Sequence, residues 1–223
     1  MRITLRKLKS GEISADVHKH QETYGADIVS MITSNPSSCG AGYVGPRKGT
    51  MFSVTEYSCA TGNYSFGHEV GHNLGLTHDR GTKNACIDDG RIGYGWRDPK
   101  AAFRTIMAYN CQKGQCDNNK GGGCAIIPRF SAPSLLHNGK AIGSPNVNSA
   151  RAINDVRATV AGYYPHVSDE TEMPAFAPTT EPTAEPTAEP TKAQHITLML
   201  KVFVGNFNFL IVVHWKQIKC DWI

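Results

Sequence analysis

The segment HEVGHNLGLTHD, residues 68–79, concentrates side chains that can bind a metal ion and move a proton. His68 and His72 are four residues apart, so on an α-helix their imidazoles lie one turn above each other on the same face. Gly75 can adopt the left-handed backbone conformation that ends a helix, and this lets His78 turn back toward the first two as a third ligand. Three neutral imidazoles with an open coordination position are typical of catalytic zinc sites, so one Zn²⁺ per chain is expected.

Glu69 directly follows the first histidine, where it can reach a water molecule on such an ion. It is the candidate general base, which takes a proton from the water and delivers it to a leaving amine. A bare HExxH motif occurs by chance, but H-E-x-x-H-x-x-G-x-x-H-D fixes six residues. Chance produces that pattern at on the order of one in a hundred million starting positions. The segment therefore predicts metal-assisted hydrolysis.

The elements that precede this segment predict an α/β unit. A polar, helix-compatible stretch at residues 14–26 leads into the apolar run DIVSMIT, residues 27–33, which predicts a helix followed by a buried strand. Two short strands around a Gly/Pro turn are expected within residues 40–45 and 50–58, near a sheet edge.

The metal-binding helix itself is predicted to begin near Tyr64, with Asn63 or Thr61 as its N-cap, and to end at Gly75. Residues 80–145 are rich in Gly, Asn, Asp, Pro and Cys and predict an irregular subdomain tied by disulfides. Apolar residues recur at helical spacing in residues 146–164, which predicts a last amphipathic helix.

Length and charge limit the classes of protein. The 223 residues, 40% of them hydrophobic, can bury one core, so a single folded domain is expected over residues 1–165. A net charge of +4 without a dense Lys/Arg block gives no reason to expect a nucleic-acid partner.

The seven cysteines include no CxxC pair, which argues against a zinc knuckle and favours disulfides formed in an oxidising compartment. Free buried thiols are the alternative. Sequence alone leaves the pairing open, and the expected bonds are Cys39–Cys59, Cys116–Cys124 and Cys86–Cys111.

The end of the chain changes character twice. Residues 166–195 are acidic and rich in Thr and Pro, which predicts an extended stalk or linker. Residues 196–223 form an apolar tail that alternates more like a strand than a helix. Membrane attachment through this tail is the alternative, but Lys201, Asn206 and Asn208 argue against it because polar groups at bilayer depth are costly.

Residues 104–110, RTIMAYN, lie downstream of the third histidine and complete a second pattern. With the zinc motif, they resemble the metzincin zinc endopeptidases, whose methionine turn lies beneath the metal; Met107 matches that methionine. Asp79 after His78 resembles the reprolysin or adamalysin branch. The resemblance implies a metzincin-like fold, a twisted mixed sheet with helices, and cleavage of peptide bonds in protein or peptide substrates.

The resemblance runs from about residue 24 to residue 164 and implies further roles. An extended substrate would lie along the edge strand, for which Gly42, Tyr43 and Val44 are the candidates, and Phe130 would form a pocket wall. Tyr109, two residues after Met107, has the spacing of a tyrosine that can approach zinc in related branches; a packed structural tyrosine is the alternative. The glycine-rich calcium repeats of serralysins are missing, so structural Ca²⁺ is not indicated.

The first seventeen residues lack the apolar core of a signal peptide, although the cysteines indicate secretion to an extracellular compartment. Metzincins have further strands and a helix before the part that starts near residue 24. The chain is therefore expected to be incomplete at its N-terminus, with an exposed apolar sheet face.

The leading hypothesis is a secreted zinc metalloendopeptidase. The alternative is an extracellular or cell-surface glycoprotein that keeps the fold and the metal without turnover. Glu69 favours the enzyme, because a binding module needs no base beside its metal. A zinc amidase for small substrates is a third hypothesis, which fits HExxH but not the third histidine together with the methionine turn.

Overall fold

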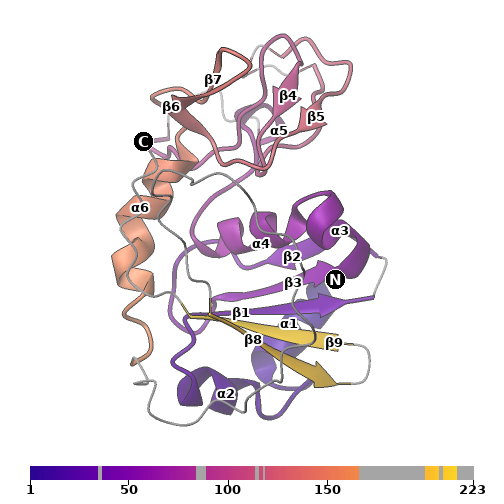
Figure 1. Ribbon diagram of the computed structural model, residues 1–223, viewed down its shortest axis with the longest axis vertical. Helices are drawn as coiled ribbons and strands as arrows, with labels where there is room; N and C mark the ends of the chain where they lie inside the picture. Colours follow the sequence, from indigo (N-terminus) through magenta and orange to yellow (C-terminus); the bar gives the residue numbers. More distant parts are fainter. Residues whose placement is uncertain are drawn as a thin grey trace, which may run out of the picture.

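The computed structural model describes residues 1–34, 37–83, 89–113, 116–117, 119–165, 199–205 and 208–214. A five-stranded sheet of order β2-β3-β1-β9-β8 lies at one end of the molecule (Figure 1). Its strands are β1 (Ile28–Thr33), β2 (Gly40–Gly42), β3 (Phe52–Glu56), β8 (Met199–Gly205) and β9 (Asn208–His214).

The sheet is mixed, as predicted. β1 runs parallel to β3, with Val29 opposite Phe52, and antiparallel to β9. β2 pairs antiparallel with β3 and forms an edge. All six residues of β1 are buried, which agrees with its continuous apolar run, typical of a strand covered on both faces.

Helices cover both faces of this sheet. Leu5 and Leu8 of α1 (Arg2–Ser10) pack with a residue of α2 (Val17–Thr23) against β1 and β3. On the other face, α4 (Ser65–Asn73) and α6 (Ser149–Val160) pack around Ile28. The expected exposed apolar face is therefore not found in the described strand β1, because helices and β9 surround it.

A short helix that was not predicted, α3 (Tyr57–Gly62), precedes α4, the helix that carries His68 and His72. Thr61 lies within α3 and Asn63 follows its last residue, so the prediction that either one caps α4 is wrong. The N-cap position of α4 is Tyr64, which has φ 55° and makes no side-chain capping bond. Gly75, with φ 91°, follows the end of α4 as predicted.

The described residues between 80 and 145 form the irregular region, which lies beyond α4 from the sheet (Figure 1). Its short elements are α5 (Arg80–Lys83), β4 (Phe103–Arg104), β5 (Ala125–Ile126), β6 (Ala132–His137) and β7 (Lys140–Ile142). β4 pairs with β5 and β6 with β7. α6 then runs from this region back along the sheet, and Asn148 caps it by accepting a bond from the backbone N–H of Arg151.

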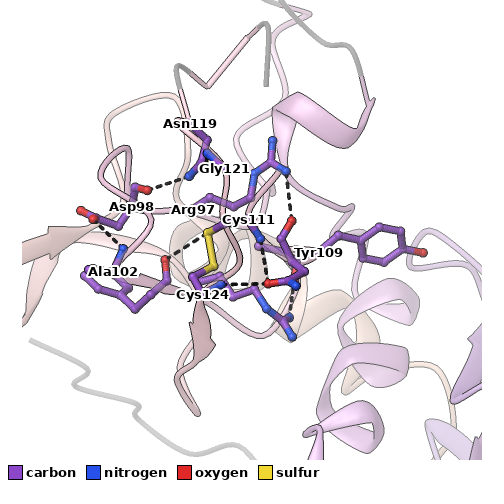
Figure 2. Close-up of a disulfide and its surroundings, with 12 residues drawn as sticks. Arg97, Asp98, Ala102, Tyr109, Cys111, Asn119, Gly121 and Cys124 are labelled. Atoms are coloured by element: carbon purple, nitrogen blue, oxygen red, sulfur yellow. Dashed lines mark hydrogen bonds between the residues drawn. A yellow bond between two sulfur atoms is a disulfide. The ribbon is translucent and has the colours of Figure 1, made fainter. Parts of the chain in front are cut away.

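Two disulfides are described in full. Cys39–Cys59 is confirmed, whereas Cys124 bonds to Cys111, so the predicted Cys116–Cys124 and Cys86–Cys111 pairs are wrong. The local backbone explains the difference (Figure 2). The side-chain oxygen of Asn110 accepts bonds from the N–H groups of both Cys111 and Cys124, which brings the two residues together. Cys116 is also disulfide-bonded, and Cys86 lies outside the described residues.

The predicted stalk, residues 166–195, lies outside the described residues. Of the tail, β8 and β9 form an antiparallel pair that extends the main sheet, in line with the strand-like alternation. No helix within the described ranges has the length and apolar character needed to cross a membrane.

Candidate metal centre

The structure brings His68, His72 and His78 together, with one nitrogen from each within 4.8 Å of the others. The first two lie one turn apart on α4. After Gly75 the chain turns back, and the N–H of Thr77 donates to the carbonyl oxygen of Gly93 at 2.8 Å, which fixes the path that returns His78 to the helix.

Hydrogen bonds fix which ring nitrogens face inward. Nδ1 of His68 lies 2.9 Å from the carbonyl oxygen of Ile106, and Nδ1 of His72 lies 2.9 Å from that of Leu76. A carbonyl can only accept, so both Nδ1 atoms carry the proton and both Nε2 atoms present a lone pair. Nε2 of His72 faces Nε2 of His78 at 3.2 Å. Such a set of converging imidazole nitrogens fits a divalent transition metal.

Burial keeps these imidazoles neutral. It is the largest cause that lowers the pKa of His68 to about 4 and the pKa of His78 to about 3, and neighbouring histidines lower both further. The pKa of His72 is also lowered, again mainly by burial. Neutral imidazole is the form that binds a metal, so the site is ready for one at neutral pH.

Glu69 is buried next to this cluster, and burial raises the pKa of its carboxyl group to about 8. The side chain fits only because β2 lacks side chains opposite it. A Cβ atom on Gly40 would lie 2.4 Å from Oε1 of Glu69. The glycine of the edge strand thus makes room for the candidate base.

Met107 is fully buried beneath α4, in a cluster with Leu76 and Ile106. A Cβ atom on Gly71 would lie 2.6 Å from the Met107 sulfur, and one on Gly95 would lie 2.4 Å from the backbone nitrogen of Ala108. Sequence reasoning singled out Met107 and missed both glycines. Gly71 lies inside the HExxH segment, where a glycine in the middle of a helix could have indicated close packing against another part of the chain.

Asp79 ties the third histidine to the methionine turn. Its carboxylate accepts from the backbone N–H of Tyr109 at 2.9 Å and from that of Thr82 at 2.7 Å. Buried Arg97 pairs with Asp79 at 3.1 Å and with Asp117 at 2.5 Å. Figure 2 shows Arg97 beside the loop that carries Tyr109. Neither a motif nor a periodic pattern pointed to Arg97.

Comparison with known proteins agrees with this geometry. Residues 6–79 match the family model described as metallopeptidase family M12B, reprolysin-like. Over this segment the chain is similar to the reprolysin-like metallopeptidases. The expected resemblance is thereby confirmed.

Curated proteins that this chain resembles are named peptidyl-Asp metalloendopeptidase. That of Stenotrophomonas maltophilia is 31% identical over 66% of this chain and 34% of its own length. The protein of Xanthomonas campestris is 32% identical, and the match covers 66% of this chain and 33% of that protein. The protein of Pseudomonas fragi is 34% identical, and the match covers 49% of this chain and 65% of that protein. The chain thus spans about a third of the first two relatives.

A solved structure described as a chaperone-substrate complex matches the fold, with a TM-score of 0.51 and 21% identity. The match covers 71% of this chain and 24% of that chain. At this identity, the likeness concerns the fold alone.

Tyr109 and Phe130 both lie near the histidine cluster. The Tyr109 ring is 48% exposed, and its centroid is 4.1 Å from that of His78. Burial raises the pKa of the Tyr109 hydroxyl, as do the charges of Glu69 and Asp79. Phe130 is partly buried against the Met107 cluster.

The other predicted substrate residues follow the edge of the sheet. Gly42 ends β2, Tyr43 packs partly into the core and Val44 is 60% exposed. The amide nitrogen of Asn73, a buried residue that sequence reasoning missed, donates to the carbonyl oxygens of Tyr43 and Phe52 at 2.9 and 3.0 Å. Asn73 therefore fastens the end of the metal-binding helix to the edge of the sheet.

Proposed function

We propose that this chain is a zinc-dependent endopeptidase that hydrolyses peptide bonds in protein substrates. The observation that carries the proposal is the convergence of three neutral imidazoles beside a buried carboxyl group. His68, His72 and His78 would hold one Zn²⁺. When bound, zinc supplies Lewis-acid polarisation of a carbonyl and lowers the pKa of a coordinated water.

Glu69 is the general base of the proposal. A carboxylate in this buried position is a stronger proton acceptor than one in water, since burial disfavours its charged form. It would take a proton at a carboxylate oxygen and pass it to the leaving amine. The packing of Glu69 against Gly40 restricts its movement and so keeps it beside the histidines.

The substrate would bind as an extended peptide along the edge strand. Gly42, Tyr43 and Val44 would line it, and Phe130 would form a wall of the adjoining pocket. Tyr109, whose ring centroid lies 4.1 Å from that of His78, would donate to the oxygen that gains charge during the reaction. Since the relatives are named peptidyl-Asp metalloendopeptidases, we take peptides with an aspartyl residue at the cleaved bond as the substrate class.

Secretion belongs to the same proposal. The described disulfides Cys39–Cys59 and Cys111–Cys124 favour an oxidising compartment such as the cell exterior.

The decisive experiment uses the Glu69→Gln variant, refolded with zinc under oxidising conditions and given a denatured protein substrate. Its zinc content should stay near one ion per chain, while hydrolysis should fall about 100- to 10,000-fold. His78→Ala should instead lose zinc on dialysis, and His20→Ala, distant from the cluster in sequence, serves as the matched histidine control. Full hydrolysis by Glu69→Gln would contradict the assigned base. A zinc-loaded wild type that cleaves nothing would support the metal-binding glycoprotein.

A further inference from the structure

Arg104 places an incompletely paired positive charge beside the metal centre. Its side chain is partly buried, and its Nη1 donates to the carbonyl oxygen of Ala108 at 2.6 Å, next to Met107. Its Nε is buried and has no hydrogen-bond partner. Burying part of a guanidinium without satisfying its donors costs stability, so a functional role could explain why an arginine occupies this position.

The turn that follows β4 brings Arg104 close to the histidines. Arg104 ends β4, and the N–H of Ala108 donates to the carbonyl oxygen of Thr105 at 3.0 Å, which closes a turn over residues 105–108. The bond from Nη1 of Arg104 to the carbonyl oxygen of Ala108 spans this turn, which contains Ile106 and Met107. Ile106 packs beneath α4, and its carbonyl oxygen contacts His68. The charge of Arg104 is also among the causes that lower the pKa of His68.

The nearest acid does not neutralise this charge. Asp79 raises the pKa of Arg104, but burial outweighs it and lowers that pKa. The Asp79 oxygens are already bonded to Thr82, Tyr109 and Arg97. Of the salt bridges described, none includes Arg104. The guanidinium therefore keeps its charge and N–H donors on its Nη atoms for an external anion, whereas its buried Nε is out of reach of one.

We propose that Arg104 determines specificity by binding the carboxylate of an acidic substrate side chain next to the cleaved bond. This inference rests on the proposed endopeptidase function and names the residue that contacts the acidic side chain of the substrate. A guanidinium suits the task because it offers a planar pair of donors that match the two oxygens of a carboxylate. The hydrogen bond to Ala108 holds it beneath the methionine turn, so little side-chain freedom remains to be lost on binding.

The test compares peptides that differ only in one residue at the cleaved bond: Asp, Asn or Ala. With wild type, kcat/KM should favour Asp over Asn by about 10- to 100-fold, the range expected for a charged hydrogen bond. Arg104→Gln should remove most of that preference, measured as the ratio of kcat/KM for the Asp and Asn peptides within the variant. Arg104→Lys should restore it only in part, since lysine keeps the charge and loses the paired donors. Arg151→Gln, an exposed arginine on α6, is the matched control and should keep the wild-type ratio.

Peptide binding to the Glu69→Gln background separates this inference from catalysis. Fluorescence anisotropy should show tighter binding of the Asp peptide than of the Asn peptide, and adding Arg104→Gln should abolish the difference. If wild type cleaves but shows no preference for Asp, or if Arg104→Gln keeps the preference, the inference is wrong. Loss of the preference in Arg129→Gln alone would assign the role to that exposed arginine instead. Failure of wild type to cleave any peptide, with the binding difference present, would overturn the proposed function alone.

Discussion

Gly42 of β2 and Glu69 of α4 lie so close that a Cβ atom on Gly42 would be 2.7 Å from the backbone oxygen of Glu69. The nearest atom belongs to the helix backbone and cannot rotate away, as the end of a side chain could. The distance between the edge strand and the metal-binding helix is thus set by the absence of a side chain at residue 42. The position of the candidate base depends on the same contact.

Gly42→Ala should therefore push β2 away from α4. Overpacking of this kind costs about 1–3 kcal/mol of unfolding free energy, and hydrolysis should fall more steeply than zinc content. Urea unfolding, metal analysis and peptide hydrolysis measure the three effects. Gly62→Ala is the control, because a Cβ atom there meets nothing within 4 Å. Equal activity in both variants would show that the contact does not position Glu69.

The pH dependence of the metal-free protein should reveal Glu69. Its folded pKa of about 8 lies above the reference value of 4.5, so the folded chain holds a proton that the unfolded chain has lost. The stabilising contribution is complete below the lower value and is lost as pH rises through the upper one. His68 and His78, with folded pKa values of about 4 and 3 against 6.5, act oppositely: their contribution is complete above 6.5 and lost as pH falls.

Near pH 6.5 the unfolded histidines are still half protonated, so His68, His72 and His78 contribute an opposite slope, and the Glu69 effect is the difference between wild type and Glu69→Gln. Between pH 6.5 and 8 this difference in unfolding free energy should decrease by up to about 1.4 kcal/mol per pH unit in the protein treated with a chelator. Glu69→Gln should therefore lack the downward contribution to the slope. Urea unfolding at several pH values measures it, and a slope unchanged in the variant would show that another group is responsible.

Arg97 stabilises the loop beneath the metal centre by pairing with two carboxylates, Asp79 and Asp117. Arg97→Met would leave Asp79, which is 1% exposed, without its counter-charge, and such a loss costs about 3–5 kcal/mol. The melting temperature should fall, and zinc affinity should fall with it because Asp79 follows His78. Lys140→Met, which removes a half-exposed partner of Asp98, should cost far less. Similar losses in both variants would refute a special role for Arg97.

Much of the centre could be predicted because its signals are local. Helical spacing placed His68 and His72 on one face, and the positive φ of Gly75 was required to return His78. The buried run of β1 and the amphipathic α6 follow from apolar periodicity in the same way.

The residues that sequence reasoning missed act over long sequence separations. Arg97 meets Asp117 twenty residues later, and Asn73 bonds to carbonyls twenty-one and thirty residues earlier. Cys111 was paired wrongly for a related reason, since the side chain of Asn110 joins it to Cys124 through contacts that spacing does not encode.

The C-terminal hairpin gives the last prediction. β9 pairs with β1 over five registered positions, and β8 pairs with β9 beyond it. A chain cut after residue 165 loses both strands, so one edge of the buried strand β1 has no partner strand and can pair with other chains. Its unfolding free energy should fall by a few kcal/mol, at about 0.5–1.5 kcal/mol per hydrogen bond, and it should aggregate as concentration rises. Urea unfolding and light scattering measure these effects. The matched control is cut after residue 214, which keeps both strands; if the two truncated chains unfold alike, the hairpin does not stabilise the sheet.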